Sequence, residues 1–66
     1  MKISINGDSK EFERTLSVSE LISELQIPTR GLIIELNGSV LGRDRFDATT
    51  LTEGDRVELI RFVGGG

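Results

Sequence analysis

The chain opens with an alternation of apolar and polar residues that predicts a β-hairpin. Ile3 and Ile5 alternate with polar neighbours, and this period of two is typical of a strand with one buried face. Asn6 and Gly7 follow, and this dipeptide is a strong hairpin signal because both residues tolerate a positive φ. We expect the second strand over residues 9–14, which contain a single apolar side chain.

The next segment changes to the spacing of an amphipathic helix. Ser17 and Glu20 match a capping box, in which each side chain binds the backbone of the other residue. Four apolar residues then follow the i, i+3, i+4, i+7 rule of one helix face: Val18, Leu21, Ile22 and Leu25. Pro28 disfavours a helical conformation at Ile27, so the helix should end near this point.

A second hairpin is predicted over residues 32–41. Leu32, Ile34 and Leu36 should share one face of its first strand, with Ile33 and Glu35 on the other. Asn37 and Gly38 provide its turn, and a short strand follows.

The remainder of the chain reads as an irregular segment followed by one more strand. In residues 42–55 we expect a loop with a short helical turn, in which Phe46 and Leu51 point inward. A turn signal at Glu53–Asp55 precedes the last strand, residues 56–63.

This order of elements predicts an α+β fold of the ubiquitin-like β-grasp type, in which a mixed sheet of four to five strands packs on one main helix. We expect a single domain over residues 1–63, with the last strand at the rigid centre of the sheet. Residues 64–66 should form a flexible glycine tail.

Composition excludes several classes of chemistry. The chain has no Cys and no His, so we expect no disulfide, no thiol or Ser-His nucleophile and no metal site of the usual kind. The net charge is −3 and the eight basic residues are scattered, which argues against nucleic acid as a partner. No apolar run approaches the ~20 residues of a membrane span. We therefore expect a cytoplasmic protein that binds no cofactor and is not an enzyme.

The glycine tail holds the remaining chemical group of interest, the carboxylate of Gly66. Gly64 and Gly65 have no side chains, so a tail of this length can extend ~10 Å into a channel too narrow for other residues. The carbonyl carbon of Gly66 is unhindered, and an attacking group can approach it freely. The alternative is an inert, frayed end.

Three segments resemble the ThiS-type sulfur carriers, a branch of the β-grasp proteins: "SVSELISEL", "ELNGSVLGRDRF" and "LTEGDRVELIRFVGGG". The chain departs from the pattern of that family at Gly42, where Pro is frequent, and at Phe46, where Trp is frequent. The resemblance implies a protein co-substrate for thiamine biosynthesis. An E1-like, ThiF-type adenylyltransferase would use ATP to adenylate the carboxylate of Gly66. A sulfur donor such as a cysteine desulfurase would convert it to a thiocarboxylate, and a ThiG-type thiazole synthase would accept the sulfur.

Alternation along residues 56–63 predicts where partners dock. Val57, Leu59, Arg61 and Val63 share one face, and Arg56, Glu58, Ile60 and Phe62 share the other. If the first set faces the helix, large apolar side chains beside the tail point outward. We expect partners to bind there through Glu58, Ile60 and Phe62. We also expect Val63 to contact partners, although alternation puts it on the other face, because it directly precedes the glycine tail.

Three other functions remain open: a sulfur carrier for molybdenum-cofactor biosynthesis, a protein modifier of the ubiquitin type, and a β-grasp binding module with an inert tail.

Overall fold

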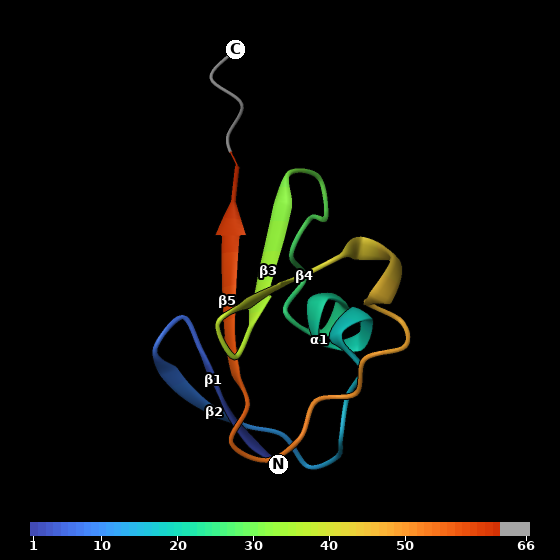
Figure 1. The fold of residues 1–66 in the computed structure, drawn as a ribbon. Helices are drawn as coiled ribbons and strands as arrows, with labels where there is room; N and C mark the ends of the chain where they lie inside the picture. Colours follow the sequence, from blue (N-terminus) through green and yellow to red (C-terminus); the bar gives the residue numbers. More distant parts are fainter. Residues whose placement is uncertain (63–66) are drawn as a thin grey trace.

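A computed structural model describes residues 1–62 of the chain, which form one mixed sheet with a helix on one side (Figure 1). The strands are β1 (Lys2–Ile5), β2 (Asp8–Glu11), β3 (Leu32–Leu36), β4 (Ser39–Leu41) and β5 (Arg56–Arg61). The helices are α1 (Val18–Glu24) and a single 3-10 turn, η1 (Arg43–Arg45). The predicted β-grasp architecture is confirmed, with five strands in the sheet.

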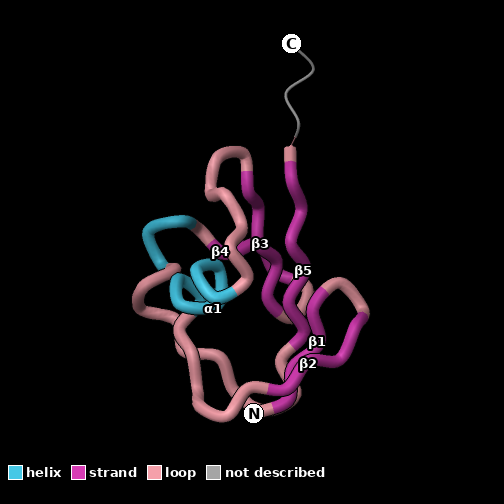
Figure 2. The backbone as a smooth tube through the Cα atoms, turned by 180° about the vertical axis from the view of Figure 1, so that it is seen from behind, coloured by secondary structure: helices cyan, strands magenta, loops and turns pink. Residues whose placement is uncertain are grey.

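The sheet has the strand order β2-β1-β5-β3-β4, so β5 is its central strand, as expected. β5 pairs with β1 in parallel and with β3 antiparallel, and both hairpins are antiparallel. Figure 2 shows the same order from behind, with β5 between β1 and β3 and α1 on one side of the sheet.

Both predicted Asn-Gly turns form, and each also binds the central strand. Asn6 and Asn37 have positive φ angles of 51° and 52°. Asn6 donates its backbone N–H to the carbonyl of Val57 at 2.9 Å, and its side-chain oxygen accepts the N–H of Leu59 at 2.8 Å. Asn37 makes the equivalent pair of bonds with Arg56, both at 2.8 Å. The two turns therefore hold β5 from opposite sides, which fixes its register.

The predicted capping box begins α1. The side chain of Ser17 accepts the N–H of Glu20 at 3.0 Å, and Glu20 in return accepts the N–H of Ser17 at 2.8 Å. This backbone hydrogen bond from Ser17 lowers the pKa of Glu20 below its ordinary value of 4.5. The helix ends at Glu24, before Pro28, as the sequence predicts. No helix within residues 1–62 is long and apolar enough to span a membrane.

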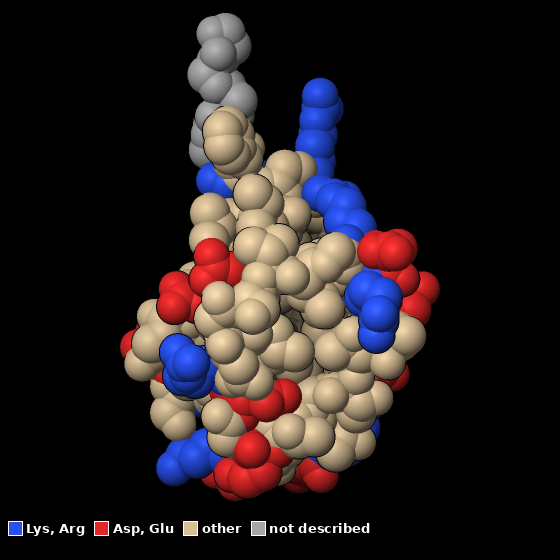
Figure 3. All heavy atoms as spheres, viewed as in Figure 1, with Lys and Arg blue, Asp and Glu red and all other residues tan. Residues whose placement is uncertain are grey.

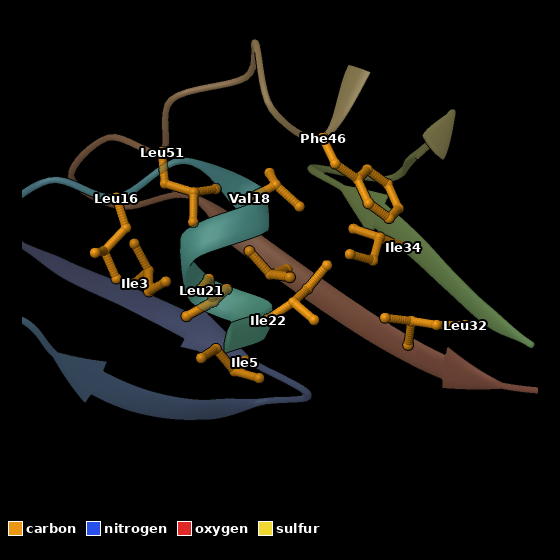
Figure 4. Packing of buried hydrophobic residues seen from close by; sticks show 11 residues of the cluster. Ile3, Ile5, Leu16, Val18, Leu21, Ile22, Leu32, Ile34, Phe46 and Leu51 are labelled. Carbon is orange, nitrogen blue, oxygen red and sulfur yellow. The ribbon is translucent and has the colours of Figure 1, made fainter. Parts of the chain in front are cut away.

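The core lies between the sheet and α1 (Figure 4). It consists of eleven buried hydrophobic residues: Ile3, Ile5, Leu16, Val18, Leu21, Ile22, Leu32, Ile34, Phe46, Leu51 and Val57. Phe46 and Leu51 point inward from the segment after β4, which confirms their predicted positions. Val18 also donates its N–H to the carbonyl of Thr49 at 2.9 Å, so this segment is tied to the start of the helix.

Two predicted strands are longer than the observed ones, because their partners end first. The predicted strand 9–14 ends at Glu11, which pairs with Lys2, the first residue of β1. The predicted strand 56–63 ends at Arg61, which pairs with Leu32, the first residue of β3.

Candidate functional site

The face of the sheet that turns away from α1 carries an apolar surface near the end of β5. Among residues 1–62, four large hydrophobic side chains are exposed: Ile33 (37%), Val40 (69%), Ile60 (41%) and Phe62 (69%). Ile33 pairs directly with Ile60, so these two side chains point to the same side of the sheet. Val40 pairs with Glu35, two residues after Ile33, and Phe62 follows Ile60 by two residues. We call these four residues the outer-face patch.

Two carboxylates lie beside the patch. Glu35 pairs directly with Glu58 across β3 and β5, so both side chains share the outer face. Glu58 is exposed and Glu35 is half-buried. Within residues 1–62 the single salt bridge at 4.0 Å or less joins Arg14 to Glu20, so neither carboxylate has a cationic partner there. The site thus combines apolar side chains with two carboxylates that form no salt bridge within residues 1–62.

The opposite face of β5 contributes to the core and then leaves it. Val57 is buried, Leu59 is half-buried and Arg61 is exposed. The alternation predicted for residues 57–62 is therefore correct, and the core thins toward the end of the strand.

The end of β5 is held by the loop before β3. Phe62 donates its N–H to the carbonyl of Gly31 at 2.8 Å. Gly31 has a φ of +71°, and a Cβ atom built on it would lie 2.7 Å from the carbonyl oxygen of Phe62. The Arg43 guanidinium donates to the carbonyl of Thr29, which ties the same loop to η1. Phe62 therefore has a defined place at the base of the predicted tail.

The predicted site residues divide into two groups. Glu58, Ile60 and Phe62 lie together on the outer face and are exposed, as alternation predicts. The others, Val63, Gly64, Gly65 and Gly66, lie outside the described residues.

Sequence reasoning missed three members of the site: Ile33, Val40 and Glu35. Alternation did place Ile33 and Glu35 on the face opposite Leu32, Ile34 and Leu36. It carried no signal that this strand lies beside β5, because strand neighbours depend on long-range pairing.

The surface elsewhere offers less for chemistry. An open depression of about 310 Å³ lies beside the end of β2, lined by Glu11, Phe12, Glu13, Arg14, Leu16 and Glu24. Residues 1–62 contain no cluster of three or more Asp, Glu, His or Cys side chains that fits a metal ion. Figure 3 shows acidic and basic side chains interspersed on the face it presents, separated by uncharged surface.

Comparison with known proteins gives a consistent result. The model of the ThiS family matches residues 3–66. The sulfur carrier protein ThiS of Bacillus subtilis is 28% identical over 65 residues, which cover 97% of this chain and 98% of that protein. A crystal structure of the thiamine biosynthesis protein ThiS from Geobacter metallireducens superposes with a TM-score of 0.89 at 42% identity, with all of both chains covered.

The chain also matches part of a larger protein. All 66 residues of this chain align with a thiazole synthase of Paramagnetospirillum magneticum at 30% identity, and they span 20% of the length of that enzyme. The family model covers nearly the whole chain and the solved structure has the same fold throughout. The chain therefore belongs to the ThiS family and has the β-grasp fold of its solved relative.

Proposed function

We propose that this chain carries sulfur for thiazole formation in thiamine biosynthesis, as a thiocarboxylate on Gly66. The observation that carries the proposal is the match to the ThiS family over residues 3–66, which includes the glycines at its end. The Bacillus subtilis relative is named a sulfur carrier protein. The relative from Paramagnetospirillum magneticum is a thiazole synthase, which supports such an enzyme as the sulfur acceptor.

Activation makes the carboxylate of Gly66 a good acyl donor. One of its oxygens attacks the α-phosphorus of ATP, pyrophosphate leaves, and an acyl-adenylate forms. A persulfide sulfur then attacks the carbonyl carbon of Gly66 and displaces AMP, which gives an acyl disulfide. A thiol cleaves the disulfide bond, so that the thiocarboxylate remains on the chain and the two other sulfurs form a new disulfide.

The chain supplies the substrate group and the contacts, and the partners supply the catalysis. Gly64 and Gly65 give Gly66 the narrow approach that a buried active site requires. Glu58, Ile60, Phe62 and Val63 serve as docking residues beside it. The partners are an E1-like, ThiF-type adenylyltransferase that binds ATP, a cysteine desulfurase as sulfur donor, and a ThiG-type thiazole synthase.

Reconstitution with these three partners and ATP tests the proposal. The full chain should support thiazole formation, and a chain that lacks Gly66 should not, although its far-UV circular dichroism remains native. Gly65→Val adds a β-branched side chain to the tail, so it should block adenylation and therefore thiazole formation as well. An inert tail predicts equal activity of all three chains. Sulfur transfer to a molybdopterin precursor in place of the thiazole would identify the acceptor as the molybdenum pathway.

A further inference from the structure

We propose that the outer-face patch and the Glu35–Glu58 pair form one docking surface for a partner protein that presents an arginine side chain among apolar residues. The inference rests on the proposed function, because the glycines that follow this surface in the sequence have to enter the active site of a partner. It adds the chemistry by which that partner is recognised.

The sheet register places the charged and apolar groups in adjacent rows. Ile33 and Ile60 form one row across β3 and β5, and Glu35 and Glu58 form the next. Val40 lies beside Glu35 on β4. Directly opposed residues have Cβ atoms about 4.5–5.5 Å apart, so one cation can contact both carboxylates. A partner that binds this surface therefore contacts apolar side chains and two negative charges together.

Opposed like charges destabilise a sheet, and no salt bridge within residues 1–62 offsets the charges of this pair. Arg56 lies on the same face, two residues before Glu58, and it forms no salt bridge with either carboxylate. An arginine guanidinium suits the two carboxylates better than a lysine ammonium does, since its planar fork can donate to both carboxylates and stack on the apolar surface beside them.

A second copy of this chain does not fit the surface. A twofold contact through the patch would bring the glutamate pairs of both copies to the same interface. Four carboxylates would then lie close together, in a protein whose net charge is already −3. The occupant is therefore a different protein with positive charge at the contact.

Binding of the ThiF-type adenylyltransferase to three forms of the chain tests the inference. The forms are the wild type, Glu35→Gln with Glu58→Gln, and a control with Glu13→Gln and Glu24→Gln. The control removes the same charge from exposed positions on the helix side of the molecule. The Glu35/Glu58 variant should bind about tenfold more weakly or worse, and its affinity should depend less on salt. It should unfold at no lower a temperature than the wild type, because repulsion is removed. The control should bind as the wild type does.

Several results would overturn the inference. One is equal affinity of the Glu35/Glu58 variant and the control. Another is a free chain that dimerises in sedimentation experiments and dimerises more tightly when both glutamates are neutralised.

The mass of the wild-type chain after incubation with partner, ATP and sulfur donor separates the two proposals. If a thiocarboxylate forms but the Glu35/Glu58 variant and the control bind the adenylyltransferase equally well, the docking inference alone is wrong. If no thiocarboxylate forms, the proposed function is wrong.

Discussion

Replacing Gly31 by Ala tests how the end of β5 is positioned. Gly31 has a φ of +71°, and its carbonyl accepts the N–H of Phe62 at 2.8 Å. An added Cβ would lie 2.7 Å from the carbonyl oxygen of Phe62, a distance at which backbone must shift. The substitution therefore strains the loop and displaces the residue at the base of the tail.

The cost of the substitution has two parts. A residue with a Cβ in the left-handed region costs about 1–2 kcal/mol. Movement of Phe62 away from the new methyl group weakens its hydrogen bond to Gly31, which is worth about 0.5–1.5 kcal/mol. We expect Gly31→Ala to lower the free energy of unfolding by about 1.5–3.5 kcal/mol.

Gly54→Ala is the matched control. Gly54 has a φ of +85°, but a Cβ at this position meets nothing within 4 Å. It should cost only the backbone term, about 1–2 kcal/mol. Because the chain has no Trp or Tyr, urea unfolding is followed by far-UV circular dichroism. Thiocarboxylate formation, measured where both variants are folded, should be slower for Gly31→Ala than for Gly54→Ala. If Gly31→Ala and Gly54→Ala lose the same stability and form the thiocarboxylate at the same rate, the contact between Gly31 and Phe62 does not position the end of β5.

Three further predictions follow from individual contacts. Asn6→Ala removes the side-chain acceptor for a β5 amide and should cost about 1–3 kcal/mol of stability in urea unfolding, whereas a loss below about 0.5 kcal/mol would show that this bond does not hold the strand. The pKa of Glu20 is lowered in the folded state, so its contribution to stability is present above pH 4.5 and is lost as the pH falls through the folded pKa. Glu20→Gln should therefore flatten the pH dependence of the melting temperature in that acid range. An unchanged slope of melting temperature against pH would show that Glu20 does not contribute to it. Ile60→Ser should weaken binding to the adenylyltransferase by about 1–2 kcal/mol in calorimetry while the melting temperature changes little, since this side chain is exposed, and unchanged affinity would remove Ile60 from the docking surface.

Local features of the fold could be predicted because their signals lie within a few residues of each other. The capping box of Ser17 and Glu20 and both Asn-Gly turns are short-range patterns, and all of them form. Alternation likewise placed Ile60 on the outer face.

Features that depend on pairing between distant segments could not be predicted. The end of β2 at Glu11 depends on where β1 begins. The contact of the Asn6 side chain with β5 joins residues 53 positions apart. Alternation gives the face on which a side chain lies, but not its neighbour across the sheet. For this reason the sequence showed Glu35 and Glu58 separately, and the structure was needed to bring them together.

The central claim is that the carbonyl of Gly66 carries the sulfur. Tandem mass spectrometry of the chain, after incubation with the adenylyltransferase, ATP and a cysteine desulfurase with its cysteine, tests this claim most directly. We predict one oxygen exchanged for sulfur, located in the C-terminal glycine fragment and absent when ATP is left out. An unmodified terminus with demonstrably active partners, or sulfur attached at any other residue, would contradict it.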